Sequence, residues 1–178
     1  MHPNACRRLL AIFWAFEFMK PYRATASSII AAPAELVYRT LADYHHGHPS
    51  ILPKSYFLSL EVERGGFGAG TVINFQTRVL GETQSFRAAI TEPEPGRVLV
   101  ETNLGEGGVV TTFIVEPLSE SSRTEVTITT DGATRRSGGL GSVERLLTKM
   151  ILQRIYKAEL KQLARVCEGA SGLGVKTS

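Results

Sequence analysis

The chain has 178 residues, of which 43% are hydrophobic and 21% charged, the size and composition of one ordinary globular domain with a sizeable core. The formal net charge is only +3 and no stretch is densely basic, so the electrostatic footprint of a nucleic-acid-binding protein is missing. Two cysteines at opposite ends exclude a disulfide framework, and no apolar run approaches the roughly 20 residues of a membrane span.

Residues 1–22 form an N-terminal extension that fits three interpretations. Its apolar run at 9–16 follows two arginines, as in a signal peptide, but charged residues interrupt the pattern before any cleavage site. Translation from Met19 would instead make residues 1–18 a misassigned extension. A short helix on a membrane surface, giving a peripheral membrane contact, is the third interpretation, because aromatic residues accompany the arginines. The cysteine usage favours a reducing compartment and therefore a cytoplasmic protein.

The domain itself is expected over residues 23–168. Small and β-branched residues at 23–32 predict a first strand. Pro33 suits the first position of a helix, and apolar residues three and four apart then predict a helix that ends near Tyr44. Glycine and prolines break the following loop at 45–55, which leaves room for a second, short helix.

Period-two alternation and regular turn residues predict an antiparallel meander after this loop. The expected strands lie at 57–64, 71–80, 83–92, 97–104, 109–118 and 123–130. The segment GGFGAG at 65–70 stands between two of these strands. A phosphate cradle needs a helix N-terminus behind the glycines, so this segment is interpreted as a turn.

A proline-free stretch from about Gly138 to Glu168 predicts one long C-terminal helix, with residues 169–178 as a flexible tail. The apolar face of this helix changes side near residue 150, so either the helix bends there or its two halves meet different surroundings. We interpret its first half, which follows several glycines, as a movable rim over a cavity and its second half as the part that packs on the sheet.

These elements predict an α+β helix-grip fold. A curved antiparallel sheet of six or seven strands wraps around the long C-terminal helix, with one or two short helices after the first strand. The final helix is the only expected element long enough to cover the apolar face of such a sheet.

Four segments resemble the START-like helix-grip superfamily, also called SRPBCC, in its bacterial polyketide cyclase/dehydrase and lipid-transport branch. They are SSIIAAPAELVYRTLADYHHGHPSILP, GGFGAGTVINF, AITEPEPGRVLVE and TTFIVEPLSESSRTEVTI. The resemblance covers residues 25–168. It implies a ligand cavity between sheet and helix, but it implies no catalytic residues, because the family has no universal catalytic motif.

The inward positions of the strands and the rim of the helix are the expected ligand-binding residues. They are Leu58, Leu60, Ile73, Phe75, Thr77, Phe86, Ala88, Ile90, Thr111, Phe113, Val143, Leu147 and Met150. The alternation places four charged strand residues on the outer face, namely Arg78, Arg87, Glu101 and Glu116. With no acidic residue expected inside, binding is favoured over acid–base catalysis.

The segment DYHHGH holds the strongest clustering of titratable residues. Histidine titrates near neutral pH, so His46 and His48, with Tyr44 and Tyr56, are the candidate proton carriers. Beyond Asp43, no acidic or cysteine partner stands at a ligand-type spacing, so neither a metal nor a cofactor is expected.

The first functional hypothesis is the binding of a hydrophobic or amphipathic small molecule, of the lipid, quinone or polyketide class. The alternative is an enzyme of the polyketide cyclase or dehydratase type that uses the histidines and tyrosines of the loop. A third hypothesis is an interaction module whose cavity is filled by its own side chains. The expected partner is an apolar small molecule and not a nucleic acid, and the oligomeric state is left open.

Overall fold

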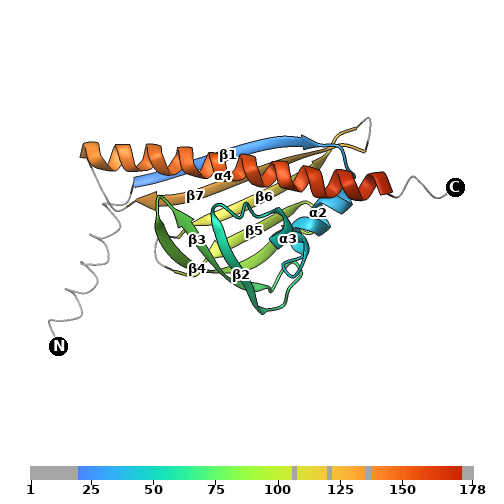
Figure 1. Cartoon of the computed structure of the whole chain (residues 1–178), viewed down its shortest axis with the longest axis horizontal. Helices are drawn as coiled ribbons and strands as arrows, with labels where there is room; N and C mark the ends of the chain where they lie inside the picture. Colours follow the sequence, from blue (N-terminus) through green and yellow to red (C-terminus); the bar gives the residue numbers. More distant parts are fainter. Residues whose placement is uncertain (1–19, 106–107, 120–121, 135–137, 174–178) are drawn as a thin grey trace, which may run out of the picture.

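The computed structural model describes residues 20–105, 108–119, 122–134 and 138–173 (Figure 1). The described elements, in chain order, are β1 (Lys20–Ile30), α2 (Ala34–Ala42), α3 (Gly47–Ile51), β2 (Phe57–Arg64), β3 (Val72–Val79), β4 (Glu82–Glu94), β5 (Val98–Asn103), β6 (Val110–Pro117), β7 (Thr124–Thr134) and α4 (Gly138–Leu173). The interpretations of residues 1–18 lie outside the described part of the chain.

The described strands form one seven-stranded antiparallel sheet in the order β1-β7-β6-β5-β4-β3-β2. Strands from β2 to β7 are neighbours in sequence order, so this part is the expected meander. The first strand, β1, forms the opposite edge of the sheet from β2 and pairs with β7, with Lys20 opposite Thr134. Figure 1 shows the sheet curving beneath α4, which confirms the expected helix-grip architecture.

The two short helices fill one end of the sheet. Pro33 caps α2 and its carbonyl accepts the N–H of Val37, and the expected short second helix is α3. Val37 and Leu41 are fully buried because the apolar side of α2 faces the core. This packing fixes the direction in which the chain leaves α2 at Asp43.

The long helix α4 lies along the edge strand β1 (Figure 1). Gln153 Nε2 donates to the Thr25 carbonyl at 3.4 Å, and the Ala31 N–H donates to Glu168 Oε1 at 3.1 Å. These two bonds tie α4 to β1 at points 15 helix residues apart, about 22 Å at 1.5 Å per residue. The helix continues past the expected end near Glu168 to Leu173.

Only the second half of α4 contributes to the core. Its buried side chains are Ile155, Tyr156, Glu159, Leu160, Leu163 and Cys167. The sequence left two alternatives, a bend near residue 150 or different surroundings for the two halves. The helix continues without a break at residue 150, so the two halves meet different surroundings. Val143, Leu147 and Met150 are about half exposed and, at 100° per residue, lie opposite the buried side. These three side chains, which the sequence pattern assigned to a movable rim, therefore point away from the sheet in this structure.

A bulge in β2 overturns the expected inward position of Leu58. The pairing of β2 with β3 shifts register between Phe57 and Ser59, so the alternation skips one residue there. Phe57 and Leu60 pack against the core, while the Leu58 side chain is 42% exposed.

The GGFGAG turn is held against the loop that follows α2. The Tyr44 N–H donates to the Gly66 carbonyl at 2.9 Å, and the Gly68 N–H donates to the Ala42 carbonyl at 2.9 Å. Gly66 has φ +129° and faces the His45 ring so closely that a Cβ there would stand 2.0 Å from Nε2. The glycines are therefore needed both for backbone conformation and for close approach. This contact holds the loop that carries Tyr44.

Candidate functional site

Glu101 lies inside the protein, contrary to the expectation that it faces solvent. Its neighbours in the sheet are Ile90 on β4 and Thr111 on β6, and side chains directly opposite each other share a face. Ile90 is buried and Thr111 is half-buried on the inner face. The Glu101 side chain is only 13% exposed. An acidic group therefore does stand within the inward set.

Tyr44 and His48 both approach the Glu101 carboxylate. The Tyr44 hydroxyl donates to Oε1 at 2.7 Å, and His48 Nε2 lies 3.6 Å from the same oxygen. The tyrosine and imidazole rings stack with their centroids 4.6 Å apart. Burial and the Glu101 charge raise the pKa of Tyr44 well above its ordinary value, so its hydroxyl keeps the proton that it donates.

The imidazole of His48 has a defined tautomer. Its Nδ1 lies 2.7 Å from the Leu41 carbonyl, which can only accept, so Nδ1 carries a proton. The other nitrogen, Nε2, is therefore the one that faces the Glu101 carboxylate. Since His48 is 3% exposed and lies edge-on to Phe113, it is held in one orientation.

The loop after α2 places the histidine side chains of DYHHGH in different surroundings. Asp43 Oδ1 accepts the backbone N–H groups of His45 and His46, which fixes the turn, and its backbone carbonyl accepts the N–H of His48. The His46 side chain is 88% exposed, so it does not reach the cluster around Glu101. Tyr56, which precedes β2, packs partly buried against the edge of the core. Of the four candidate proton carriers, the structure brings together Tyr44 and His48.

Glu159 on α4 is the second buried acid, and the sequence reasoning missed it. Its side chain is 3% exposed, and burial together with the nearby Glu101 charge raises its pKa to about 8. Among the described residues, Oε1 of Glu159 has no hydrogen-bond partner. Ile155, Glu159 and Leu163 stand four residues apart on the buried face, so a charged residue inside an apolar row was the signal that could have identified it.

A hydroxyl network continues the polar interior along the sheet. Thr111 and Thr130 share a hydrogen bond at 2.7 Å, and Thr130 is also bonded to the Tyr156 hydroxyl. Burial is the largest cause of the raised pKa of Tyr156, and the charge of Glu159 adds to it. Glu159 interacts electrostatically with Tyr156 of this network and with Tyr44 and Glu101, so it lies near both groups. We call Tyr44, His48, Glu101 and Glu159 the acid cluster.

The acid cluster can exchange protons and can bind a polar group. A carboxyl with a pKa of about 8 is mostly protonated at neutral pH, so Glu159 is a neutral acid there, able to donate from one oxygen and accept at the other. Glu101 and His48 supply a carboxyl and an imidazole nitrogen within 3.6 Å of each other. Such convergence of titratable groups in an apolar interior is typical of functional sites.

The other predicted ligand-binding residues of the strands, apart from Leu58, lie on the inner face of the sheet. Ile73, Ala88, Ile90 and Phe113 are buried, whereas Leu60, Phe75, Thr77, Phe86 and Thr111 are half-buried. Phe75 and Phe86 stack with their centroids 5.2 Å apart. Their contact with a ligand stays a prediction.

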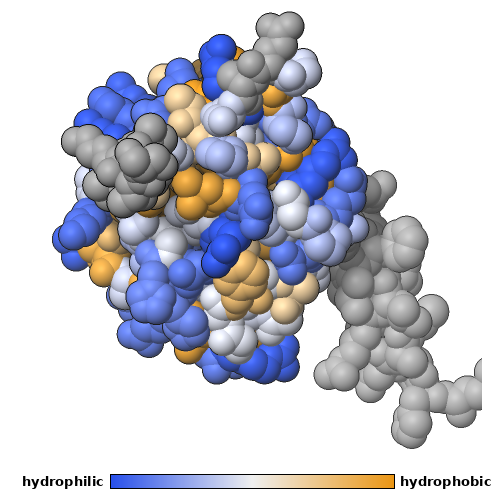
Figure 2. Space-filling view, turned by 90° about the vertical axis from the view of Figure 1, so that its right-hand side faces the viewer, coloured by the Kyte–Doolittle hydropathy of each residue, from blue (hydrophilic) through white to orange (hydrophobic). Residues whose placement is uncertain are grey.

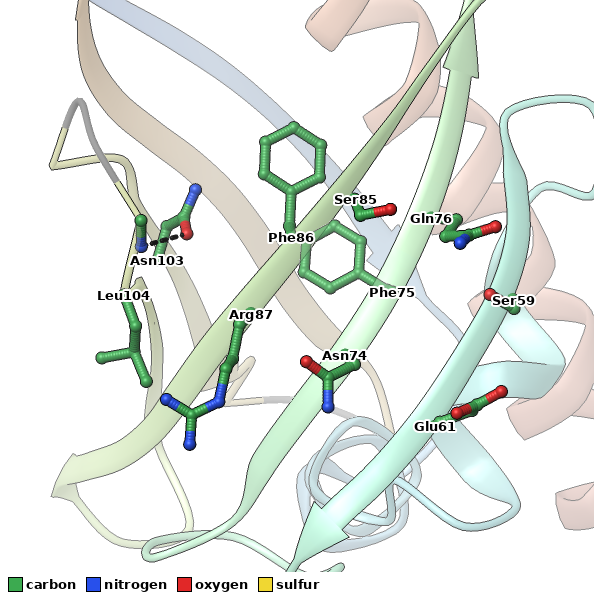
Figure 3. A pocket seen from close by; sticks show the side chains of 11 residues that line it. Ser59, Glu61, Asn74, Phe75, Gln76, Ser85, Phe86, Arg87, Asn103 and Leu104 are labelled. Atoms are coloured by element: carbon green, nitrogen blue, oxygen red, sulfur yellow. Dashed lines mark hydrogen bonds between the residues drawn. The ribbon is translucent and has the colours of Figure 1, made fainter.

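Two open grooves lie on the surface, and no residue of the acid cluster lines either of them. The first, of about 550 Å³, crosses the outer face of β2, β3 and β4 (Figure 3). There Arg87 makes a bidentate ion pair with Glu63, at 2.6 and 2.7 Å. Phe75 and Phe86 reach the lining of this groove. The polar side chains drawn in Figure 3 come from β2, β3 and β4 and, at Asn103, from the end of β5, with α4 behind them.

The second groove, of about 690 Å³, runs beside α2 and includes Arg39, Asp43, His46, Phe67 and Val166. Figure 2 looks at the end of the molecule where α4 ends, and polar residues there surround separate apolar spots.

Within the described residues, no group of three or more His, Cys, Asp or Glu side chains could hold a metal ion. Among the same residues, no helix is long and apolar enough to cross a membrane.

Most of the chain matches one known protein family. Residues 21–168 match the model of the family described as polyketide cyclase/dehydrase and lipid transport. The chain belongs to this family. No curated protein sequence matches it.

Solved structures share the fold at low sequence identity. The NMR structure of the KanY protein has a TM-score of 0.71 and 24% identity, and the match covers 84% of this chain and 99% of that one. The ZhuI aromatase/cyclase from Streptomyces sp. R1128 has a TM-score of 0.69 and 23% identity, covering 84% and 94% of the two chains. Norcoclaurine synthase from Thalictrum flavum, in complex with dopamine and hydroxybenzaldehyde, has a TM-score of 0.64 and 17% identity, covering 93% and 94%. These similarities establish the helix-grip fold alone.

Proposed function

We propose that this protein binds a hydrophobic or amphipathic small molecule, of the lipid, quinone or polyketide class, between the sheet and α4. The observation that carries this proposal is the buried, unpartnered oxygen of Glu159. A buried polar atom without a partner costs roughly 1–3 kcal/mol, so its retention inside an apolar core needs a compensating role. Hydrogen bonding to the polar end of an otherwise apolar ligand is such a role.

The half-buried apolar residues support the same site. Phe57, Leu60, Phe75 and Leu152 border the core without being fully enclosed. They offer apolar contact to the body of a ligand whose polar end lies at Glu159. Family membership supports small-molecule binding in general, and the ligand class is our proposal.

A fluorescence titration with the neutral apolar probe N-phenyl-1-naphthylamine tests this function. We expect saturable uptake, and we expect 1-dodecanol to displace the probe about tenfold more effectively than dodecane, because one hydrogen bond contributes roughly 1–1.5 kcal/mol. Glu159→Leu should abolish the preference for the alcohol. Glu116→Leu is the matched control, since Glu116 is exposed on the outer face, and it should keep the preference. Absence of probe uptake, or equal displacement by both compounds in the unmodified protein, would refute the proposal.

The acid cluster favours one second candidate, an enzyme of the polyketide cyclase or dehydratase type. Ring closure of a polyketone removes a proton from a carbon beside a carbonyl and delivers a proton to a carbonyl oxygen. The Glu101–His48 pair would take the first proton, and Tyr44 or Glu159 would supply the second. The sequence-level argument against acid–base catalysis, the absence of an inward acid, no longer holds.

The enzymatic candidate is tested with a linear 1,5-diketone, whose aldol ring closure and loss of water are followed by NMR. We expect conversion above background that His48→Gln and Glu101→Gln remove, while the exposed-site variant His46→Gln keeps it. If the protein binds the naphthylamine probe but converts the diketone only at the background rate, binding is the function that survives.

A further inference from the structure

The first half of α4 carries an exposed apolar stripe, which we define as Leu140, Val143, Leu147 and Met150. Their exposed fractions run from 47% for Leu147 to 79% for Leu140. The spacings of three, four and three residues put them on one face of the helix. Leu146 borders the stripe and is 59% exposed. Four large apolar side chains exposed in a row on one helix face are a feature typical of a surface that a partner covers.

The stripe does not belong to the site between sheet and helix. Measured around the helix at 100° per residue, its centre lies about 180° from the centre of the buried set that includes Ile155, Glu159 and Leu163. The acid cluster therefore faces the sheet while the stripe faces away from it. Whatever covers the stripe lies on the outer side of α4.

We propose that the stripe is covered by the N-terminal segment of the same chain, residues 1–19. The described strand β1 begins at Lys20, opposite Thr134 in β7, and α4 begins at Gly138. Four residue steps from Thr134 to Gly138 span at most about 14 Å. The segment thus joins the body of the protein beside the first turn of α4.

Length and composition fit this occupant. The stripe extends over ten residue steps, about 15 Å of helix. Nineteen residues exceed that distance in either a helical or an extended conformation. The segment also contains LLAIFWAF at 9–16, the longest apolar run of the chain. Docking would remove two apolar surfaces from water at once, at the cost of ordering a segment that is already tethered beside its site.

Trp14 makes the proposal directly testable, because it is the sole tryptophan of the chain. Its fluorescence reports on the segment alone. In the full chain we expect emission typical of an apolar environment, and a shift to longer wavelength when Val143→Asp and Leu147→Asp are combined. Leu104→Asp is the matched control, because Leu104 is 48% exposed but belongs to the groove on the outer face of the sheet, and it should leave the emission unchanged.

Hydrogen exchange supplies a second measurement that leaves the stripe itself unaltered. Phe13→Asp in the full chain should speed amide exchange over residues 140–150 and leave residues 155–167 unchanged. Solvent-like Trp14 emission in the unmodified protein overturns the proposal. An emission wavelength that stays the same in the stripe variants overturns it as well. A burial signal that vanishes on dilution identifies a second copy as the occupant, and one that appears only with anionic phospholipid vesicles identifies a membrane surface. Either result also overturns the proposal.

Discussion

Burial strongly disfavours the charged form of Glu159, the residue that we propose hydrogen-bonds the ligand. A carboxyl group placed 97% inside a protein loses its hydration, and the neighbouring Glu101 adds a like charge. Both effects favour the protonated form and raise the pKa from 4.5 to about 8. In the unfolded chain the same group ionises near pH 4.5. The folded state therefore holds one more proton than the unfolded state between these two values.

This difference predicts how stability depends on pH. Because the folded state holds the extra proton, the free energy of unfolding should fall as pH rises from about 5 to 8, by up to about 1.4 kcal/mol per pH unit from this group. Glu159→Gln should remove this contribution and be more stable than the unmodified protein at pH 8. Urea unfolding of both proteins at pH 5, 6, 7 and 8 measures the difference. Parallel pH profiles would show that Glu159 is not held protonated by the fold.

Tyr44 provides the second prediction at the scale of single residues. Its hydroxyl donates to Glu101 in a buried setting, and Tyr44→Phe would leave that carboxylate short of a donor. We expect a loss of roughly 1–3 kcal/mol in the free energy of unfolding at neutral pH. Tyr56→Phe, at the edge of the core, should cost less than half as much. Equal effects of the two substitutions in urea unfolding would contradict the special role of Tyr44.

The sequence pattern assigned Glu101 and Leu58 to the wrong face of the sheet, for identifiable physical reasons. Val98, Leu99 and Val100 are apolar on both faces of β5, so alternation alone could not assign Glu101 to a side, and only the strand register does so. Leu58 was misplaced because a bulge adds one residue to β2, which no period-two pattern reveals.

At the scale of elements, the glycine turn at 65–70 connects β2 to β3 and supports the loop bearing Tyr44. Gly66→Ala should be strongly destabilising, because its Cβ would clash with the His45 ring and its φ is +129°. Gly70→Ala meets nothing within 4 Å and carries the backbone cost alone, of order 1 kcal/mol. Thermal unfolding should therefore give a clearly lower Tm for Gly66→Ala than for Gly70→Ala. Similar Tm values would show that His45 moves aside freely.

The two halves of α4 give a matched pair of substitutions on one helix. Ile155→Asp places an unpaired charge in the core and should cost several kcal/mol. Leu147→Asp changes a half-exposed side chain and should cost within about 1 kcal/mol. Urea unfolding of both variants is the measurement, and a comparable loss at the two positions would contradict the division of the helix.

The apolar pattern of α4 predicted that its halves differ, but it could not say how. A switch of face is compatible with a bend, with a lid or with a second covering partner. In the structure α4 lies unbroken along β1, and the apolar side chains of its first half point away from the sheet.

At the scale of the whole molecule, the elements from β1 to α4 supply a complete buried cluster. Among the residues that the structure describes, every member of this cluster lies between Ala24 and Cys167. A chain that begins at Met19 should therefore still unfold cooperatively, as circular dichroism during a urea titration would show. The same chain should have a greater tendency to self-associate, because the apolar stripe loses its proposed cover. Loss of a cooperative transition would place part of residues 1–18 in the core.

The architecture as a whole was predictable because most elements carry unambiguous signals. Alternation with glycine and proline turns marked the meander, Pro33 marked the start of α2, and length marked α4. The interior polar groups were not predictable in the same way, since a buried glutamate and an exposed one look alike in a sequence. Their environment is created by long-range pairing, which local patterns do not encode.

The strand order has a consequence for how the protein is made. Of the described strands, β1 emerges from the ribosome first, yet among them it pairs only with β7. Arg23 and Asp131, which form an ion pair across these two strands, are 108 residues apart. At roughly 5–20 residues per second, β1 waits several seconds with both edges unpaired while the rest of the sheet is synthesised. Such unpaired strands are aggregation-prone, and contacts this distant in sequence also slow folding. The newly made chain is therefore most vulnerable before β7 and α4 have appeared, and a chaperone that holds β1 during this interval would raise the yield of folded protein.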